Sequence, residues 1–366
     1  MKRKIFSILF ALVLVLSFSP VTAVPVAANP IWGATLTADT TLDSDLIGSG
    51  TALIIGADGI TLDLNGYTLS GDSTGYGVDN TGGYDGVTIK GGTIDGFGQG
   101  IKANGVSNFT LKDLSFSGDT SGGHAHVIDI RNSANVTIRD VGIVVGTGSP
   151  SWGEAIRLQS IDCVEVINVD VDGGWTGVNF AYDDKLPLPQ PPTKGIVKDS
   201  TFSNNAFVGV FITNTTSAMV LNNTITNTGW LAGIYAGYGP VVTGVVIKDN
   251  EVSGGTGYGI ALSGRDNCVV SGNRVLDGFG WGGIALYGGA SNSVHHNTVT
   301  NSDGDGICVE EASDSIHHNT VTDSTGYGIH LTDTSHDNTV HHNTLSGNTL
   351  GDIQDVGTNN EVFKNS

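Results

Sequence analysis

The chain has 366 residues, of which 54 are glycine and only 14% are charged. This composition disfavours helical bundles and coiled coils, which need more Ala, Leu, Lys and Glu and far fewer helix-breaking residues. Because 39% of the residues are hydrophobic, the chain can bury a large core, which disfavours a disordered protein. The sequence therefore predicts a folded, all-β protein.

The first 28 residues are predicted to be a signal peptide. Basic residues at positions 2–4 precede an apolar run over 5–18, and small residues that suit cleavage end at Ala23 and at Ala28. The run is too short to span a bilayer comfortably, so we expect no membrane insertion of the mature chain. The expected location is secreted, either extracellular or on the cell surface.

The charge balance is strongly acidic. Asp and Glu number 36 against 16 Lys and Arg, a formal net charge of −20, and loss of the N-terminal cations would lower it to about −23. Such a surface repels nucleic acid and anionic membranes, so neither is an expected partner.

Internal repeats follow a predicted N-terminal cap (29–60) and fill the chain over 61–358, before a C-terminal end at 359–366. A hexapeptide of the form apolar-x-x-Asn-x-apolar recurs, and earlier copies keep its apolar frame without the Asn, giving twelve copies in all. We expect the asparagine side chains to form one inward-facing ladder of hydrogen bonds. These asparagines are Asn223, Asn250, Asn273, Asn297, Asn319 and Asn343.

A second element lies between these copies: a small residue, an apolar residue, any residue and another apolar residue, as in 259–262 and 283–286. Alternation with period two predicts short strands with one buried face. A unit this small cannot bury that face alone, so successive units must stack. Three strands per repeat, with Asn at a tight corner that tolerates αL geometry, predict a single-stranded right-handed parallel β-helix of about twelve coils.

These repeats and the segment 60–69 (Ile-Thr-Leu-Asp-Leu-Asn-Gly-Tyr-Thr-Leu) resemble the pectate-lyase-like superfamily and its NosD-like repeat proteins over about residues 35–360. The resemblance implies the β-helix fold, within a superfamily that includes polysaccharide lyases, glycoside hydrolases, epimerases, phage tailspikes and apparent non-enzymes. Blocks expected of polygalacturonase-like hydrolases are absent apart from an isolated Asp183-Asp184, so no catalytic assignment is transferred. Copper, which the name NosD suggests, is poorly supported because Met219 is the one methionine after the predicted signal peptide.

Stacking places equivalent positions of neighbouring coils about 4.8 Å apart, so that residues can be followed in columns. The outward column of the second element is polar and ionic in its N-terminal half, and two neighbouring columns add further charged residues there. The sequence therefore predicts one patch of cations, carboxylates and an imidazole. Its members are Lys102, His126, Asp129, Arg131, Glu154, Arg157 and Asn179.

Two catalytic schemes fit this patch, whose candidate catalytic residues are His126, Asp129, Glu154 and Arg157. In hydrolysis, Asp129 and Glu154 would serve as acid and as base or nucleophile, and their separation would decide between retention and inversion. In β-elimination on a uronate, the cations would neutralise the substrate carboxylate while His126, or alternatively Lys185, removes the C5 proton. The competing interpretation is a salt-bridge ladder that eases the stacking of like charges.

Aromatic residues and a Pro-rich insertion at 182–192 flank the patch. Exposed indoles suit the apolar faces of sugar rings, and the insertion cannot continue a sheet, so we expect it to form a wall beside a groove. Alternatively, the aromatics only cover the edge of the solenoid. The candidate substrate-binding residues are Lys102, Arg131, Trp152, Trp175, Asn179, Tyr182, Asp183, Lys185, Trp230 and Tyr235.

Histidine pairs occupy the corner positions before the last three repeat asparagines, where earlier coils carry Lys-Asp pairs. The replacement indicates a structural, solvent-facing column, whereas imidazoles stacked about 4.8 Å apart also suit Zn²⁺, Cu²⁺ or Ni²⁺. Asp303 and Asp305, in an Asp-Gly-Asp-Gly segment, are a weaker candidate for Ca²⁺, because such segments more often mark a turn. The candidate metal ligands are His295, His317 and His341.

Three cysteines, Cys163, Cys268 and Cys308, lie at unrelated spacings that fit neither a disulfide framework nor a zinc motif. We expect them to be small buried or groove-wall residues.

The functional prediction is a secreted protein that acts on or binds polysaccharide, as a lyase or glycoside hydrolase on an acidic glycan. The alternative is a non-catalytic surface or adhesion module, or a NosD-like metal-binding repeat protein.

Overall fold

The computed structural model describes residues 29–118, 126–145, 153–181, 192–239 and 242–366. The predicted signal peptide lies outside these ranges, as do Trp152, Tyr182, Asp183 and Lys185. Over the described ranges the chain forms strands and turns without helices, which confirms the all-β prediction. Accordingly, these ranges contain no helix with the length and apolar character needed to cross a bilayer.

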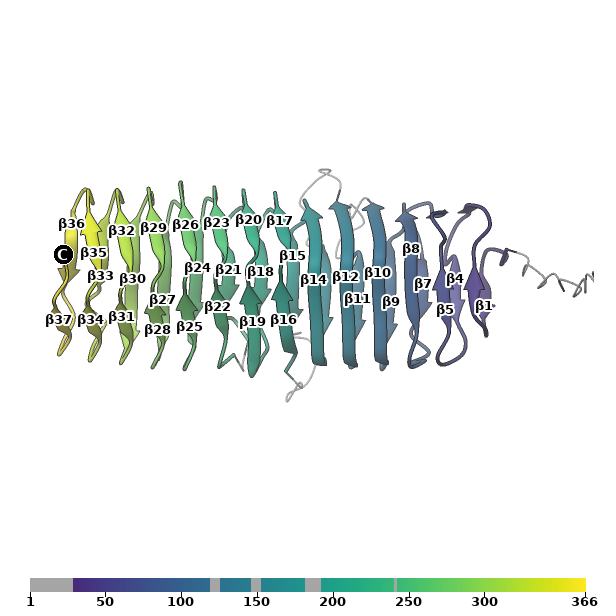
Figure 1. The fold of residues 1–366 in the computed structure, drawn as a ribbon, viewed down its shortest axis with the longest axis horizontal. Helices are drawn as coiled ribbons and strands as arrows, with labels where there is room; N and C mark the ends of the chain where they lie inside the picture. Colours follow the sequence, from purple (N-terminus) through teal and green to yellow (C-terminus); the bar gives the residue numbers. More distant parts are fainter. Residues whose placement is uncertain (1–28, 119–125, 146–152, 182–191, 240–241) are drawn as a thin grey trace, which may run out of the picture.

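Successive coils stack into a rod, and the first strands of the coils form one sheet, called sheet A below (Figure 1). Sheet A has fourteen strands: twelve precede the twelve predicted repeats, and β1 and β36 add one strand at each end. Its strands are Ala34–Leu36 (β1), Leu53–Ile55 (β4), Tyr76–Asn80 (β7), Gln99–Asn104 (β9), Ile128–Arg131 (β11), Glu154–Gln159 (β13), Thr176–Ala181 (β15), Val208–Ile212 (β18), Ala232–Ala236 (β21), Tyr258–Ser263 (β24), Gly282–Ala290 (β27), Asp305–Ala312 (β30), Tyr327–Leu331 (β33) and Gly351–Asp355 (β36).

The rest of each coil contributes a second and a third strand, and four coils merge the two into one long strand. The long strands are Thr88–Asp95 (β8), Ser107–Gly118 (β10), Ala134–Val145 (β12) and Asp162–Asp172 (β14). The separate second strands are Thr40–Thr41 (β2), Thr61–Asp63 (β5), Lys194–Lys198 (β16), Ser217–Leu221 (β19), Val246–Lys248 (β22), Val269–Ser271 (β25), Ser293–His295 (β28), Ser315–His317 (β31), Thr339–His341 (β34) and Glu361–Phe363 (β37). The third strands are Leu46–Ile47 (β3), Thr68–Ser70 (β6), Thr201–Ser203 (β17), Thr224–Thr226 (β20), Glu251–Ser253 (β23), Arg274–Leu276 (β26), Thr298–Thr300 (β29), Thr320–Thr322 (β32) and Thr344–Ser346 (β35).

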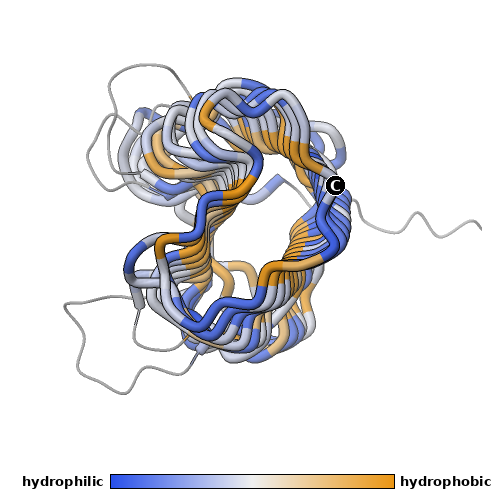
Figure 2. Tube along the Cα trace, turned by 90° about the vertical axis from the view of Figure 1, so that its left-hand side faces the viewer, coloured by the Kyte–Doolittle hydropathy of each residue, from blue (hydrophilic) through white to orange (hydrophobic). Residues whose placement is uncertain are grey.

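Side-chain alternation places the core inside the coils. In β33, Ile329 and Leu331 are fully buried while His330 between them is partly exposed. Figure 2, which looks along the rod, shows apolar residues of successive coils lining its inner side. These residues form one continuous hydrophobic core, and each fully buried aliphatic side chain contributes about 1.5–3 kcal/mol.

The repeat asparagines form the predicted ladder. The Nδ2 atom of each donates to the Oδ1 atom of the next at 2.9–3.0 Å, and the ladder ends at Asn365. The αL conformation at this corner belongs to the preceding residue and not to the ladder asparagine: Asn222 and His296, for example, have φ of 52° and 56°. The buried amides thus bind backbone groups that the tight corner leaves unpaired.

A second buried ladder, at the turn after sheet A, escaped the sequence analysis. The backbone N–H of Asn292 donates to Asp314 at 2.7 Å, and that of Asp314 donates to Asn338 at 2.8 Å. Cys268 occupies the equivalent position one coil earlier, and its N–H donates to Asn292. Because Cys268 and Asp314 interrupt the run of asparagines at this position, the sequence does not mark this ladder as a regular repeat.

Candidate functional site

Strand register confirms the predicted outward column. Lys102 of β9 lies beside Asp129 of β11, followed by Arg157 of β13 and Asn179 of β15. His126 lies just before β11. Together with two flanking residues these form what is called the charged cluster below: Lys102, His126, Asp129, Arg131, Glu154, Arg157 and Asn179.

Asp129 is the fully buried anion of the charged cluster. Arg131 makes two contacts with it, from Nε to Oδ1 and from Nη2 to Oδ2, each at 2.9 Å. Lys102 Nζ donates to Oδ2 at 2.8 Å. Both carboxylate oxygens are therefore held by cations, and Asp129 in turn fixes the positions of Arg131 and Lys102.

Glu154 is the second carboxyl group, and its two oxygens differ. Oε1 accepts a hydrogen bond from Asn179 Nδ2. Oε2 is buried and has no hydrogen bond within the described residues, although His126 Nδ1 lies 3.5 Å away and Arg157 Nη1 3.8 Å away. His126 Nε2 lies 3.4 Å from Arg157 Nη1. One oxygen of Glu154 is thus anchored, while the other faces an imidazole and a guanidinium.

These environments move the proton affinities of the three groups in different ways. Burial alone would raise the pKa of Asp129, but Arg131 and Lys102 outweigh it and lower that pKa to about 2. Burial raises the pKa of Glu154 above its usual value, opposed by Arg157 and Asn179. Burial lowers the pKa of His126 to about 3, so its imidazole is neutral at physiological pH. The charged cluster therefore holds an ionised Asp129 and a neutral His126.

The cations of the charged cluster lie nearer to solvent than its carboxyl groups. Side-chain exposure is 20% for Lys102, 28% for Arg131 and 15% for Arg157, against none for Asp129 and 12% for Glu154. The patch is therefore locally cationic on a strongly acidic protein, which favours an anionic ligand there.

An aromatic row continues from the charged cluster along the outer face of sheet A. Trp175, just before β15, stacks on Phe207 with ring centroids 5.0 Å apart, and Phe207 stacks on Trp230 at 5.6 Å. Tyr258 and Trp281 extend the row, and Trp230 and Trp281 are 60% and 43% exposed. The row comprises Trp175, Phe207, Trp230, Tyr258 and Trp281.

Phe207 was missed by the sequence analysis, although a signal was present. It stands two residues before Gly209, as Trp175 stands two residues before Gly177. Tyr235, a predicted binding residue, packs edge-on against Phe211 at 5.5 Å, beside the aromatic row.

A hollow of about 450 Å³ lies along the turn after sheet A, on the same coils as the charged cluster. Its lining includes Asn132, Ser133, Ser160 and Lys194, and none of the charged-cluster side chains. It adjoins the cluster through Arg131, which immediately precedes Asn132 in the chain. The two features are neighbours and not one pocket.

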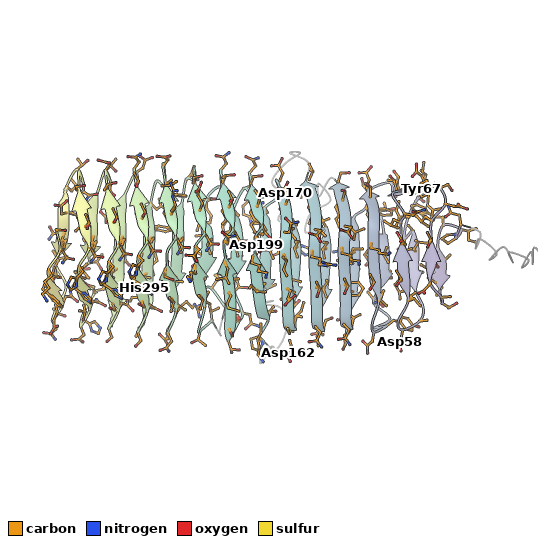
Figure 3. The ribbon with its side chains drawn as sticks, viewed as in Figure 1. Asp58, Tyr67, Asp162, Asp170, Asp199 and His295 are labelled. Atoms are coloured by element: carbon orange, nitrogen blue, oxygen red, sulfur yellow. The ribbon has the colours of Figure 1, made fainter. Side chains whose placement is uncertain are left out.

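The predicted histidine column is present on the outside of the rod, in one of the rows of side chains in Figure 3, where His295 is labelled. The rings of His295, His317 and His341 stack with centroids 5.0 and 5.1 Å apart. Each also approaches the histidine that follows it in the chain, with Nδ1 atoms 2.8–2.9 Å apart. The column therefore presents three equivalent pairs of imidazoles.

All three cysteines are free, with Cys163 exposed and the other two buried. Of the two aspartates considered for Ca²⁺, Asp303 is exposed, whereas the Asp305 carboxylate binds His330 and the backbone of Tyr327.

The chain belongs to the right-handed β-helix family. The family's right-handed β-helix region matches residues 74–239, 154–317 and 191–350, which overlap to cover most of the chain. The predicted right-handed parallel β-helix is thereby confirmed. A search of the curated proteins finds no match.

Similar solved structures include both enzymes and an adhesin. The A-module of the mannuronan C-5 epimerase AlgE4 of Azotobacter vinelandii is 15% identical, with a TM-score of 0.55 over 89% of this chain and 91% of that one. The periplasmic alginate epimerase AlgG is 13% identical, with a TM-score of 0.55 over 86% and 78%. PfbA, a surface adhesin of Streptococcus pneumoniae, is 13% identical, with a TM-score of 0.54 over 85% and 83%. At these identities the similarity establishes the fold alone.

Proposed function

We propose that this protein binds an acidic polysaccharide on the outer face of sheet A and acts on it at the charged cluster. The observation that carries the proposal is the partial exposure of Lys102, Arg131 and Arg157 around the buried Asp129 and the largely buried Glu154, in a chain of net charge −20. An anionic sugar is attracted to this patch while most of the surface repels it. The aromatic row leads away from the patch, and its exposed indoles suit the faces of further sugar rings.

The proposed chemistry is removal of the C5 proton of a uronate. Lys102, Arg131 and Arg157 bind the sugar carboxylate and stabilise the negative charge that spreads onto it when the proton leaves. Glu154 is the proposed proton acceptor, because Oε1 is held by Asn179 while Oε2 has no hydrogen bond within the described residues. Oε2 is buried, so the transfer requires the Glu154 side chain to turn this oxygen toward the sugar. The raised pKa of Glu154 makes its carboxylate a stronger base than an ordinary one.

The carbanion formed in this step has two outcomes. Return of a proton to the opposite face inverts C5, whereas loss of the O4 substituent breaks the chain and leaves an unsaturated sugar. The mannuronan C-5 epimerase among the similar structures supports the first outcome. Hydrolysis would need Asp129 to exchange protons, but both its oxygens are held by Arg131 and Lys102, so the geometry favours a positioning role for Asp129.

The second candidate is a binding module without catalysis, supported by the structural similarity to the adhesin and by the aromatic row, which needs no reaction to bind glycan. The two candidates differ in a single observable, because only proton removal exchanges the hydrogen at C5 with solvent.

The test is incubation of the mature protein in deuterium oxide with polymannuronate, with polygalacturonate and with a neutral glucan. Nuclear magnetic resonance reads deuterium at C5, and ultraviolet absorbance reads the unsaturated product. We expect C5 exchange on a polyuronate and none on the glucan. Arg157→Gln should lose the exchange, whereas Lys248→Gln, which removes an exposed cation from the second strands, should keep it.

The outcomes separate the candidates. Deuterium exchange at C5 without chain cleavage indicates an epimerase, and ultraviolet absorbance from the unsaturated product indicates a lyase. Binding of a polyuronate without exchange would contradict catalysis and support the binding module, and failure to bind either polyuronate would overturn the whole proposal.

A further inference from the structure

A second group of reactive side chains lies near the C-terminal end of sheet A, away from the charged cluster. Asp305 begins β30, Cys308 lies three residues later on the same strand, and His330 of β33 stands directly beside Cys308. Six strand spacings separate β30 from β13, which places this group about 29 Å from Glu154. It therefore cannot take part in the reaction proposed at the charged cluster.

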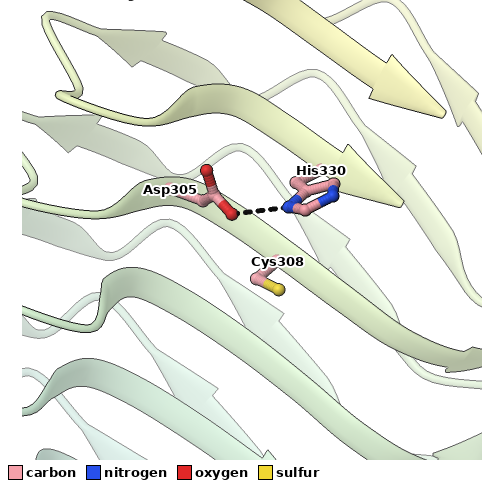
Figure 4. Close-up of side chains that lie close together, drawn as sticks. All are labelled: Asp305, Cys308 and His330. Carbon is pink, nitrogen blue, oxygen red and sulfur yellow. Dashed lines mark hydrogen bonds and ion pairs between the residues drawn. The ribbon is translucent and has the colours of Figure 1, made fainter. Parts of the chain in front are cut away.

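The three side chains converge on one point. Asp305 Oδ2 and His330 Nδ1 are 2.7 Å apart, and one ligand atom from each of the three residues lies within 4.8 Å of the others. Figure 4 shows the carboxylate and the imidazole joined by this contact, with the Cys308 thiol close beside them. Within the described residues, no other group of three or more His, Cys, Asp or Glu side chains brings its ligand atoms this close together.

Neighbouring groups hold the first two side chains in place. The backbone N–H of Tyr327 donates to Asp305 Oδ1 at 2.7 Å, which leaves Oδ2 directed at His330. The Tyr327 ring packs against the His330 imidazole with centroids 5.1 Å apart. Cys308 is buried, whereas Asp305 and His330 keep about a fifth to a quarter of their side-chain surface exposed. The group is thus fixed on the protein side and open on the solvent side.

We propose that Asp305, Cys308 and His330 bind a single transition-metal ion, Zn²⁺ or a close analogue, with its remaining coordination position open to solvent. A carboxylate, an imidazole and a thiolate are all ligands of zinc, and sulfur and nitrogen donors disfavour Ca²⁺ and Mg²⁺. Binding requires the Cys308 thiol to release its proton and the 2.7 Å contact between Asp305 and His330 to open by a fraction of an ångström, so that both coordinate the ion. Three protein ligands with one open position characterise zinc sites that bind water or a substrate, in contrast to closed structural sites.

Sequence analysis missed this site because its residues are not contiguous. In the sequence, Asp305 is a weak candidate for Ca²⁺ within an Asp-Gly-Asp-Gly segment, and Cys308 belongs to no local zinc motif. The ligands come together only through the register of β30 and β33.

The test uses the untagged mature protein, freed of metal by a chelator and titrated with Co²⁺. We expect a thiolate-to-cobalt charge-transfer band that saturates at one ion per chain and disappears when Zn²⁺ displaces cobalt. Cys308→Ser should remove the band, and His330→Ala should weaken cobalt binding at least tenfold. Cys268→Ser and His317→Ala are the matched controls and should leave the band intact. Absence of the band from the wild-type protein, or its persistence in Cys308→Ser, would overturn the proposal.

A second measurement needs no variant. Alkylation of Cys308, followed by peptide mass, should slow at least tenfold when Zn²⁺ is present, while alkylation of the exposed Cys163 should not change. Equal rates for Cys308 with and without Zn²⁺ would also overturn the proposal.

Discussion

Asp129 and Glu154 show how neighbouring residues give two carboxyl groups opposite properties. Both are withdrawn from solvent, but Asp129 contacts two cations at hydrogen-bond distance, whereas Arg157 approaches Glu154 no closer than 3.8 Å. Direct contacts outweigh burial at Asp129 and lower its pKa, while burial dominates at Glu154 and raises its pKa. Glu154 is therefore better suited than Asp129 to accept a proton from a substrate.

Glu154→Gln should lower the rate of hydrogen exchange at C5 by about 10²- to 10⁴-fold. The amide keeps the volume, and its oxygen can still accept the hydrogen bond from Asn179, so the melting temperature should stay close to that of the wild type. Trp230→Ala is the matched control: it should weaken polysaccharide binding by loss of a stacking surface and keep the exchange rate at saturating substrate. Full activity of Glu154→Gln would assign the proton transfer to another group.

The buried pair Glu311 and Asp314 gives a prediction about pH. Burial and the charge of the partner raise the pKa of Glu311, and burial raises that of Asp314. The folded protein therefore keeps protons that the unfolded chain loses, so the free energy of unfolding falls as pH rises above the ordinary carboxyl range. Asp314→Asn removes the negative charge that Asp314 carries at high pH. It places an amide in the second ladder, beside Asn292 and Asn338.

We expect Asp314→Asn to stabilise the protein at pH 8 by about 1–3 kcal/mol, with a smaller effect at pH 4.5, where the wild-type pair is protonated. Thermal melting at both pH values measures the difference. Asp303→Asn, at an exposed position, is the control and should have no effect. A loss of stability in Asp314→Asn at pH 8 would show that the charge itself is needed.

At the scale of the elements, the asparagine ladder supplies hydrogen bonds that the strands cannot. Asn273 accepts bonds from the backbone N–H and Nδ2 of Asn250, and it donates to the carbonyl of Ile247 and to Asn297. Asn365, at the end of the ladder, accepts the same two bonds from Asn343 but is only partly buried. Position within the ladder should therefore decide the cost of a substitution.

Asn273→Ala should destabilise the protein by about 3 kcal/mol or more, because several buried groups lose their partners. Asn365→Ala should lower the free energy of unfolding by clearly less, because water can reach the backbone N–H and the Nδ2 of Asn343 that lose their partner. Melting temperatures of the two variants give the comparison. Equal losses would mean that the ladder contributes through packing and not through its buried hydrogen bonds.

The histidine column gives a prediction about metal ions. Partial burial and the neighbouring imidazoles lower the pKa of His317 to about 4 and those of His295 and His341 below their usual value, so the rings are neutral at pH 7. We predict that Cu²⁺ or Zn²⁺ raises the melting temperature at pH 7, and that the increase is lost in acid when the imidazoles protonate. Measurement in the Cys308→Ser background separates this effect from the proposed site at Cys308. If His317→Ala shows the same increase, the column is structural only.

For the whole molecule, the repeat made the fold and much of the charged cluster predictable. Alternating residues fixed the strands, the hexapeptide fixed the coil length, and together they placed Lys102, Asp129 and Arg157 in one column, as the strand register shows. A solenoid permits this because each coil contacts only its neighbours, so spacing in the sequence becomes spacing along the rod.

The sequence did not predict contacts that depend on the conformation of individual side chains. The sequence placed Asp129 on the outward face, but not beneath Arg131 and Lys102, which bury it. Phe207 departs from the Trp and Tyr pattern of its neighbours, and Asp305, the first residue of β30, reaches His330 on the next coil. For Asp129 and Asp305 the deciding factor is a side-chain conformation that the repeat does not specify, whereas for Phe207 it is the residue type.

Recognition of an acidic polysaccharide by the charged cluster can be tested with two forms of one polymer: a polyuronate and the same polyuronate after its carboxyl groups have been reduced to alcohols. Isothermal titration calorimetry measures the binding of each to the wild-type protein and to Arg157→Gln. The wild type should bind the charged polymer, more weakly as salt increases, and should bind the reduced polymer at least tenfold more weakly. Arg157→Gln should lose most of this preference. Equal binding of the two polymers by the wild type would contradict recognition of an acidic polysaccharide by the charged cluster.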